Sequence, residues 1–341
     1  MNRIVVAAAA AAVALGAATG ASAQTKIVFN SFAPPKFVIN QGMIDAWAKN
    51  VEKATQGRVK VELVTGLAPP QQQWEMVTQG VADGAYIFNA FARKRLLLPQ
   101  IAHLPFVTPT ATAQAVALWR IHKETFEKAN EHKGVAFLGY FGSPAAQIAS
   151  LDADKPFVAV GDLKDVKTWS LPGDQARALA KLGAVIVPGP AVRSYEIISK
   201  GIVNAYGGQN CDSSYSFNIA QFAKSMTFIP GGMGSAAFSV FLNQQKWDSI
   251  PKKDQEAIMG VSGEALAKLS EVWDAREVKS CERMRAEGKI KVIKASDELV
   301  AALKREWAFL ADEWVENANS RHIDGRAALV RYEQLTEQLA K

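Results

Sequence analysis

The chain has 341 residues, of which 49% are hydrophobic and 21% are charged. This is an ordinary globular composition, and it argues against long disordered regions. The net charge of +6 is spread along the chain without a long basic run or an arginine–aromatic repeat, so nucleic-acid binding is not expected.

The N-terminus has the pattern of a secretory signal peptide. A short basic start at Asn2 and Arg3 precedes an apolar run over residues 4–18, and the triplet Ala-Ser-Ala follows at 21–23. The apolar run is shorter than the ~20 residues that a membrane-spanning helix needs. We expect residues 1–23 to be removed, which leaves 318 residues of the 341, and the net charge falls to +5 with the loss of Arg3. A chain of this length predicts two domains.

The first part of the mature chain alternates strand and helix patterns. The expected elements are a strand over 26–30, a helix over 43–51, a strand over 59–64, a helix over 71–79 and a strand over 85–88. Apolar residues recur every three or four positions in the helices and every second position in the strand over 59–64. Strands that alternate with helices at this spacing predict an α/β domain with a largely parallel sheet.

A second α/β unit follows in the same style. Its expected elements are strands over 135–140, 166–170, 184–187 and 202–206, with helices over 174–182 and 194–200 between the last three strands. A strand-like segment over 226–242 is interrupted at 230–232, and the chain from Lys252 onward is nearly all helical. No flexible linker separates the two units, which favours two lobes hinged around a cleft.

Recognisable catalytic and metal-binding motifs are absent from the sequence. It contains no phosphate-binding loop, no nucleophile elbow and no pair of histidines at metal-ligand spacing. The two cysteines, Cys211 and Cys281, could form one disulfide in an oxidising compartment, but their spacing does not show whether they meet. We therefore expect no enzyme activity, no metal and no cofactor, and we leave the disulfide open.

Five segments carry recognisable motifs in a fixed order. They are Gln-Gly-Val-Ala-Asp-Gly at 79–84, the stretch ending in Leu-Pro-Phe at 98–106, Asp-Leu-Lys-Asp-Val-Lys at 162–167, the stretch over 195–205, and Asn-Gln-Gln-Lys-Trp with Ile-Pro and Asp-Gln at 243–255. In this order they resemble the DctP-type solute-binding subunits of tripartite ATP-independent periplasmic (TRAP) transporters. The resemblance covers essentially the whole mature chain.

This resemblance implies an α/β, two-lobed periplasmic binding protein fold, with an interlobe ligand cleft and a long helix spanning both lobes. Lobe I would take residues 24–143 and about 230–262, lobe II residues 144–229 and the C-terminal helices, and the spanning helix about 263–288. The implied partners are a small-molecule solute and the membrane subunits of a TRAP transporter. We expect a periplasmic location and a monomer.

The sequence departs from the family at the residue that usually binds the solute. In most members Asp-Leu-Lys-Gly-Leu-Lys is followed, after one residue, by an arginine whose planar guanidinium pairs with a substrate carboxylate. Here that position is Trp169, and a second basic position falls near the uncharged residues Ala146 and Gln147. The usual arginine clamp is therefore missing.

Aromatic and amide side chains are the candidates that replace the clamp. The expected ligand-binding residues are Trp169, Tyr206, Phe32, Tyr86, Phe88, Tyr140, Phe141, Asn89, Gln147, Gly208, Gln209, Asn210 and Asp212. Aromatic faces attract ammonium groups and stack on flat rings, and Asp212 could supply a counter-charge. We expect a polar solute, a cationic amine or amino-alcohol, or a neutral aromatic compound. The alternatives are an organic acid bound without arginine, a ligand-sensor subunit, and an enzyme built on this scaffold.

Overall fold

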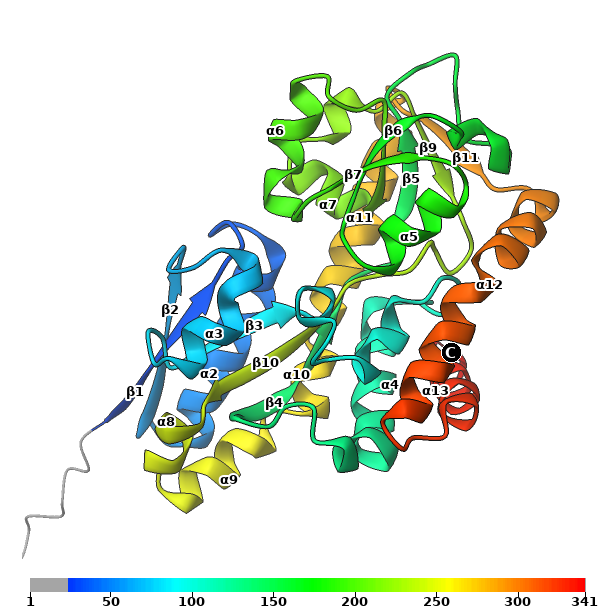
Figure 1. Cartoon of the computed structure of the whole chain (residues 1–341). Helices are drawn as coiled ribbons and strands as arrows, with labels where there is room; N and C mark the ends of the chain where they lie inside the picture. The colour runs from blue at the N-terminus through cyan, green and yellow to red at the C-terminus, as the bar shows by residue number, and fades with distance from the viewer. Residues whose placement is uncertain (1–23, 341) are drawn as a thin grey trace, which may run out of the picture.

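The computed structural model describes residues 24–340, so the expected signal peptide lies outside the described residues. Two lobes, each built on its own sheet, lie one above the other (Figure 1). The first sheet has the order β2-β1-β3-β10-β4, with β1 Thr25–Ser31, β2 Val59–Thr65, β3 Gly84–Phe88, β4 Val135–Gly142 and β10 Ala237–Asn243. β1 pairs in parallel with β2 and β3, whereas β10 is antiparallel to both β3 and β4.

The second sheet has six strands in the order β11-β9-β5-β8-β6-β7. Their bounds are β5 Gln147–Ser150, β6 Lys167–Ser170, β7 Val185–Pro188, β8 Ala205–Gln209, β9 Ser225–Phe228 and β11 Lys291–Lys294. β6 is parallel to β7 and β8, and β5 is antiparallel to β8 and β9. The short edge strand β11 lies in a region that the sequence predicted to be almost entirely helical. It was not predicted because four residues are too few to show a period-two pattern.

Helices pack around both sheets, and two of them cross from one lobe to the other. Those of the first lobe are α2 Asp45–Ala54, α3 Gln73–Thr78, α4 Ala111–Ile121, α8 Gln244–Ser249, α9 Lys252–Gly260 and α10 Glu264–Lys268. Those of the second lobe are α5 Asp174–Lys181, α6 Ser194–Ser199 and α7 Cys211–Ser216, and the chain ends with α11 Glu271–Glu287, α12 Asp297–Ser320 and α13 Gly325–Leu339. Within residues 24–340, no helix is long and apolar enough to cross a membrane.

The chain passes between the lobes four times. The segments from β4 to β5 and from β9 to β10 make two crossings, and the helices α11 and α12 make the others. α11 contacts α4 of the first lobe and α7 of the second, so the expected spanning helix is present. The stretch expected over 263–288 is divided into α10 and α11, and α11 ends at Gly288, which has the left-handed conformation typical of a helix C-terminus.

The C-terminal helices do not all lie on the second lobe, where the sequence-based division placed them. α12 contacts α5 of the second lobe and the 3₁₀ segment η4 (Leu98–His103) of the first, whereas α13 packs against α4 of the first lobe. The reason is the apolar face of α13, which includes Leu329 and Tyr332 and is buried in the same cluster as Leu118 of α4.

Candidate functional site

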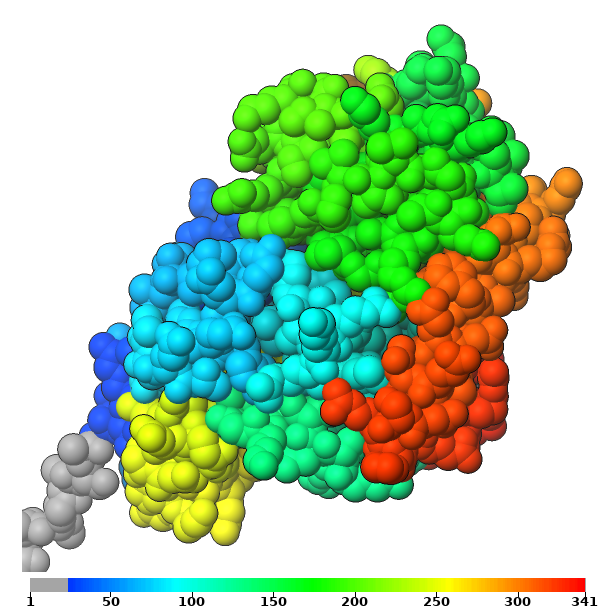
Figure 2. Space-filling model, in the orientation of Figure 1, coloured from blue at the N-terminus to red at the C-terminus, as the bar shows by residue number. Residues whose placement is uncertain are grey.

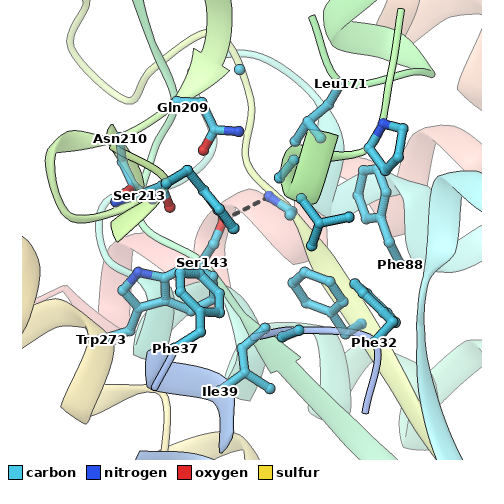
Figure 3. A pocket seen from close by; sticks show the side chains of 18 of the residues that line it. Phe32, Phe37, Ile39, Phe88, Ser143, Leu171, Gln209, Asn210, Ser213 and Trp273 are labelled. Atoms are coloured by element: carbon cyan, nitrogen blue, oxygen red, sulfur yellow. Dashed lines mark hydrogen bonds between the residues drawn. The ribbon is translucent and has the colours of Figure 1, made fainter. Parts of the chain in front are cut away.

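A pocket lies where the two lobes meet, and the surfaces of the two lobes touch on the face seen in Figure 2. It has about 570 Å³ of space, including its opening to solvent. The lining residues are Phe32, Ala33, Phe37, Ile39, Phe88, Phe91, Ser143, Leu171, Pro190, Ala191, Val192, Gly208, Gln209, Asn210, Ser213, Phe217, Ala236, Phe238 and Trp273. They come from both lobes and from the spanning helix α11, so neither lobe forms the site alone (Figure 3).

The wall from the first lobe consists mainly of phenylalanine rings. Phe32 and Phe37 follow β1, Phe88 ends β3, Phe91 lies in the 3₁₀ segment η3 (Asn89–Ala92), and Phe238 lies on β10. The Phe88 ring centroid lies 5.2 Å from that of Phe91 and 5.7 Å from that of Phe238. These separations are typical of packed aromatic pairs, so the wall is preformed for a flat apolar group.

The wall from the second lobe is more polar. β8 ends at Gln209, and Asn210 then caps α7 by accepting a hydrogen bond of 2.8 Å from the backbone N–H of Ser213. Gly208 has φ +98°, and a Cβ at this position would come within 2.6 Å of Gln175 Oε1. Only glycine therefore suits this place, where the backbone itself borders the pocket.

Two lining residues carry side-chain hydrogen-bond donors that have no partner within the described residues. Gln209 Nε2 and Trp273 Nε1 are buried, and neither has a hydrogen-bond partner within the described part of the chain. None of the lining residues is acidic or basic. Because a buried donor without a partner costs free energy, these two groups favour a bound molecule that brings oxygen acceptors.

Five of the residues predicted from the sequence border the pocket. They are Phe32, Phe88, Gly208, Gln209 and Asn210. Phe32 and Phe88 were selected because they lie at strand ends, whereas Gln209 and Asn210 were selected as polar groups that could orient a solute.

Other predicted residues lie one layer behind the lining. The Tyr86 ring lies 4.8 Å from Phe32 and its hydroxyl bonds Ser31 Oγ at 2.7 Å, while Phe141 stacks on Phe238 at 4.7 Å. The polar side chains of this group form hydrogen bonds with residues outside the pocket lining. Tyr140 bonds His122, Asn89 Oδ1 accepts from Ser239, and Gln147 Oε1 accepts from the N–H of Ile229.

Trp169 and Tyr206, the leading candidates from the family motifs, are neighbours in the second sheet and do not line the pocket. Both are fully buried. Trp169 Nε1 lies beside Gly189 and under the helix α6, and the Tyr206 hydroxyl donates to Ser214 Oγ at 3.2 Å. Trp169 lies on β6 as the sequence predicted, but its indole is buried in the hydrophobic core and does not border the pocket.

Asp212 is also absent from the lining, and its charge is already paired. Its Oδ1 lies 3.0 Å from Arg276 Nε, and the residue is 2% exposed. It therefore supplies no counter-charge for a cation in the pocket.

Several lining residues were missed by sequence reasoning. They include Phe37, Phe91, Ser143, Ser213, Phe217 and Trp273. Trp273 falls in the nearly all-helical region predicted after Lys252, where it belongs to an apolar stripe with the spacing of a helix. Nothing in the local sequence distinguishes the side of that stripe that meets the solute from the side that meets the core.

An ion pair joins the two lobes at the edge of the site. Arg93, which directly follows η3, donates to Asp174, the first residue of α5, at 2.7 Å, and Arg177 donates to the same oxygen at 3.1 Å. Behind Phe88, the ring of His103 lies 5.0 Å away. Burial lowers the pKa of His103 to about 4, so this side chain is neutral near pH 7 and adds no positive charge.

Two lobes that enclose a pocket between them, with a helix spanning both, define a solute-binding protein of the periplasmic type. Residues 29–317 match the family model described as bacterial extracellular solute-binding protein, family 7 (DctP), and the chain belongs to this family. Its members serve transport and are not enzymes. TRAP solute-binding proteins are periplasmic and pass small solutes to membrane subunits. That this chain acts as a monomer stays a prediction.

Known proteins with this fold resemble the chain along nearly its whole length. The outer membrane transporter protein TsaT of Comamonas testosteroni is 34% identical over 307 residues, which is 90% of each chain. A TRAP solute-binding protein of Bordetella bronchiseptica with bound mandelate is 28% identical, with a TM-score of 0.88 over 92% of this chain and 99% of that one. One from Rhodoferax ferrireducens in complex with benzoate is 22% identical, with a TM-score of 0.83 over 92% of this chain and 98% of that one.

Proposed function

We propose that this TRAP solute-binding protein captures a small aromatic carboxylate and binds it without an arginine clamp. The observation that carries the proposal is the pairing of a phenylalanine wall with unpaired buried donors, Gln209 Nε2 and Trp273 Nε1, in a pocket without charged lining residues. The ring of the solute would lie against the first lobe, and its oxygens would face the second lobe and α11.

The aromatic wall accounts for affinity in this proposal. A phenyl ring that buries on the order of 100 Å² of apolar surface gains about 2.5 kcal/mol, and packing against Phe32, Phe88 and Phe238 adds aromatic contacts. A carboxylate strengthens the hydrogen bonds that it accepts, because charge-assisted bonds exceed neutral ones. An ammonium group finds no carboxylate among the lining residues, since Asp212 is paired with Arg276 outside the lining. This argues against the cationic solute that the sequence suggested.

Similarity to the mandelate-binding protein of Bordetella bronchiseptica supports the same class of solute. Mandelate combines a phenyl ring with a carboxylate, which are the two features that the pocket favours. The alternative of a neutral aromatic solute differs only in its head group, and the experiment below separates the two.

Calorimetric titration of the mature protein with four ligands of similar size tests the proposal. Benzoate and mandelate should bind, benzamide should bind more weakly, and benzylamine should not bind. Gln209→Leu removes one donor without adding charge, so it should weaken benzoate more than benzamide. Gln221→Leu, at an exposed position of the 3₁₀ segment η9 (Ala220–Phe222) of the same lobe, is the matched control. Preferential binding of benzylamine, or of benzamide over benzoate, would overturn the proposal.

A further inference from the structure

The spanning helix α11 holds both lobes through carboxylates on successive turns. Asp274 accepts hydrogen bonds from the backbone N–H groups of Ala111 and Thr112, at 2.7 and 2.9 Å, and so caps α4 of the first lobe. One turn later, Glu277 accepts from the backbone N–H groups of Cys211 and Asp212, at 2.9 and 2.8 Å, at the start of α7.

The segment that Glu277 holds is the polar edge of the pocket. Asn210 and Ser213 line the pocket, and the two N–H groups bound by Glu277 belong to the residues between them. The disulfide Cys211–Cys281, with the Cα atoms 5.3 Å apart, joins the same segment to α11. The question left open by the sequence is thereby answered, and the bridge also removes both thiols as metal ligands beside Glu277.

Within residues 24–340, no basic side chain pairs with the carboxylate of Glu277. The charged groups that face it are Asp212 from α7 and Asp274 from its own helix, and Arg276 is engaged by Asp212 at 3.0 Å. Burial and these two acidic neighbours raise the pKa of Glu277 to about 7, although the two backbone N–H groups oppose the shift. The side chain therefore changes charge near neutral pH, next to the pocket edge.

We propose that Glu277 is a positioning residue for solute capture, and that its protonation state sets the affinity for an anionic solute. This inference rests on the proposed function, because it assumes that the solute carries a carboxylate. An ionised Glu277 places a negative charge behind Asn210 and Ser213 and opposes the anion. By linkage, binding of the anion favours the protonated form, so capture near pH 7 takes up protons.

Benzoate affinity measured by calorimetry from pH 5.5 to 8.5 tests the inference, because carboxylic acids with a pKa of about 4 stay ionised throughout this range. Wild-type protein should bind roughly three- to tenfold more weakly at pH 8 than at pH 6. Glu277→Gln, which mimics the protonated carboxyl, should give a flat profile. Titrations in buffers of different ionisation enthalpy should show proton uptake by the wild type and none by this variant.

Glu282→Gln is the matched control, because Glu282 is exposed on the same helix. It should keep the wild-type pH profile. A flat wild-type profile, or a Glu277→Gln profile that follows the wild type, would overturn the inference. The pH-dependence of His103 does not interfere, since its pKa of about 4 lies below the range tested.

Hydrogen exchange of the ligand-free protein separates this inference from the proposed function. If Glu277 positions α7, amides over 210–213 should exchange faster in Glu277→Ala than in Glu282→Ala, with little change in α5. Equal exchange in the two variants would refute the positioning role. A wild type that binds no aromatic acid at any pH would refute the proposed function instead, and the exchange result would still decide the role of Glu277.

Discussion

The two walls of the pocket differ in how they are built. The wall from the first lobe is a set of phenylalanine rings supported by further aromatic side chains, such as Tyr86 behind Phe32. The wall from the second lobe is a strand end and a short helix that are held in place by α11 through a disulfide and a carboxylate. Packing thus forms one wall, while specific polar and covalent bonds form the other. The first is suited to affinity and the second to recognition of the head group.

Removing the disulfide should cause the largest loss of stability, because it releases the second-lobe wall from α11. The double variant Cys211→Ala, Cys281→Ala lacks a disulfide that joins residues 70 positions apart in the sequence. Its loss is expected to lower the free energy of unfolding by about 4 kcal/mol. Urea unfolding of the variant beside the wild type checks this. Equal stability of the two proteins would mean that the disulfide does not stabilise the second-lobe wall.

Acid should act mainly on the first lobe. Burial lowers the pKa of His122 to about 4, so between pH 6.5 and 4 the unfolded chain binds a proton there that the folded chain does not. Stability therefore falls as the pH falls through this window, by about 3 kcal/mol for this group. His122→Phe should reduce the fall in unfolding free energy by that amount.

The control for this experiment is His322→Asn, since His322 is exposed and has a left-handed backbone that asparagine tolerates. It should leave the dependence of stability on pH as in the wild type. A His122→Phe variant with the slope of the wild type would show that acid destabilises the protein through other groups.

Truncation of the first-lobe wall should weaken binding without regard to the head group. Phe32→Ala removes a half-buried ring and is expected to cost about 2 kcal/mol, or roughly thirtyfold in Kd, for benzoate and benzamide alike. Calorimetric titration of both ligands measures this. Loss of affinity for only one of the two ligands would contradict the assignment of affinity to the first-lobe wall and of head-group recognition to the second-lobe wall. Phe222→Ala, outside the lining, serves as the control.

The ion pair between the lobes, Arg93 with Asp174, should affect mainly the rate at which the solute dissociates. Arg93→Ala breaks the interlobe pair with Asp174, which is 4% exposed and keeps Arg177 as a partner. The expected result is a dissociation rate about fivefold higher, corresponding to about 1 kcal/mol. Stopped-flow displacement of benzoate measures the rate, and Arg95→Ala, a neighbouring change outside this pair, is the control. An unchanged rate would show that the pair does not hold the lobes together.

A single hydroxyl of the second-lobe wall should have the smallest effect. Ser213→Ala removes one polar group from the pocket edge and is expected to cost about 1 kcal/mol for benzoate. The loss should be smaller for benzamide, whose neutral oxygen forms weaker bonds. If the two losses are equal, the hydroxyl does not contact the head group. Ser216→Ala, on the same helix but outside the lining, is the comparison.

The family, the fold and most strands were predictable from the sequence, because ordered motifs and period-two or helical spacing survive along the whole chain. Phe32 and Phe88 were predictable for a physical reason, since residues at strand ends meet at the edge of a sheet. Phe37 and Trp273 were not, because their place depends on how a loop and the spanning helix dock against the other lobe.

Trp169 illustrates a different limit of sequence reasoning. The motif locates its backbone on β6 correctly, but it does not predict the rotamer of an indole where the family has a guanidinium. That side chain is covered by Gly189 and α6, which are close in space only after folding. The absence of a charged side chain at this position can be read from the sequence, whereas the surroundings of the residue that replaces it depend on the packing.

The four crossings between the lobes also set how the protein can move. Two of the crossings are helices, α11 and α12, and a helix resists bending far more than an extended segment does. Rotation of one lobe is therefore confined to directions that both helices can follow together, and the joint is stiff rather than loose. A joint of this kind favours one shared hinge rotation over independent movement of the two lobes.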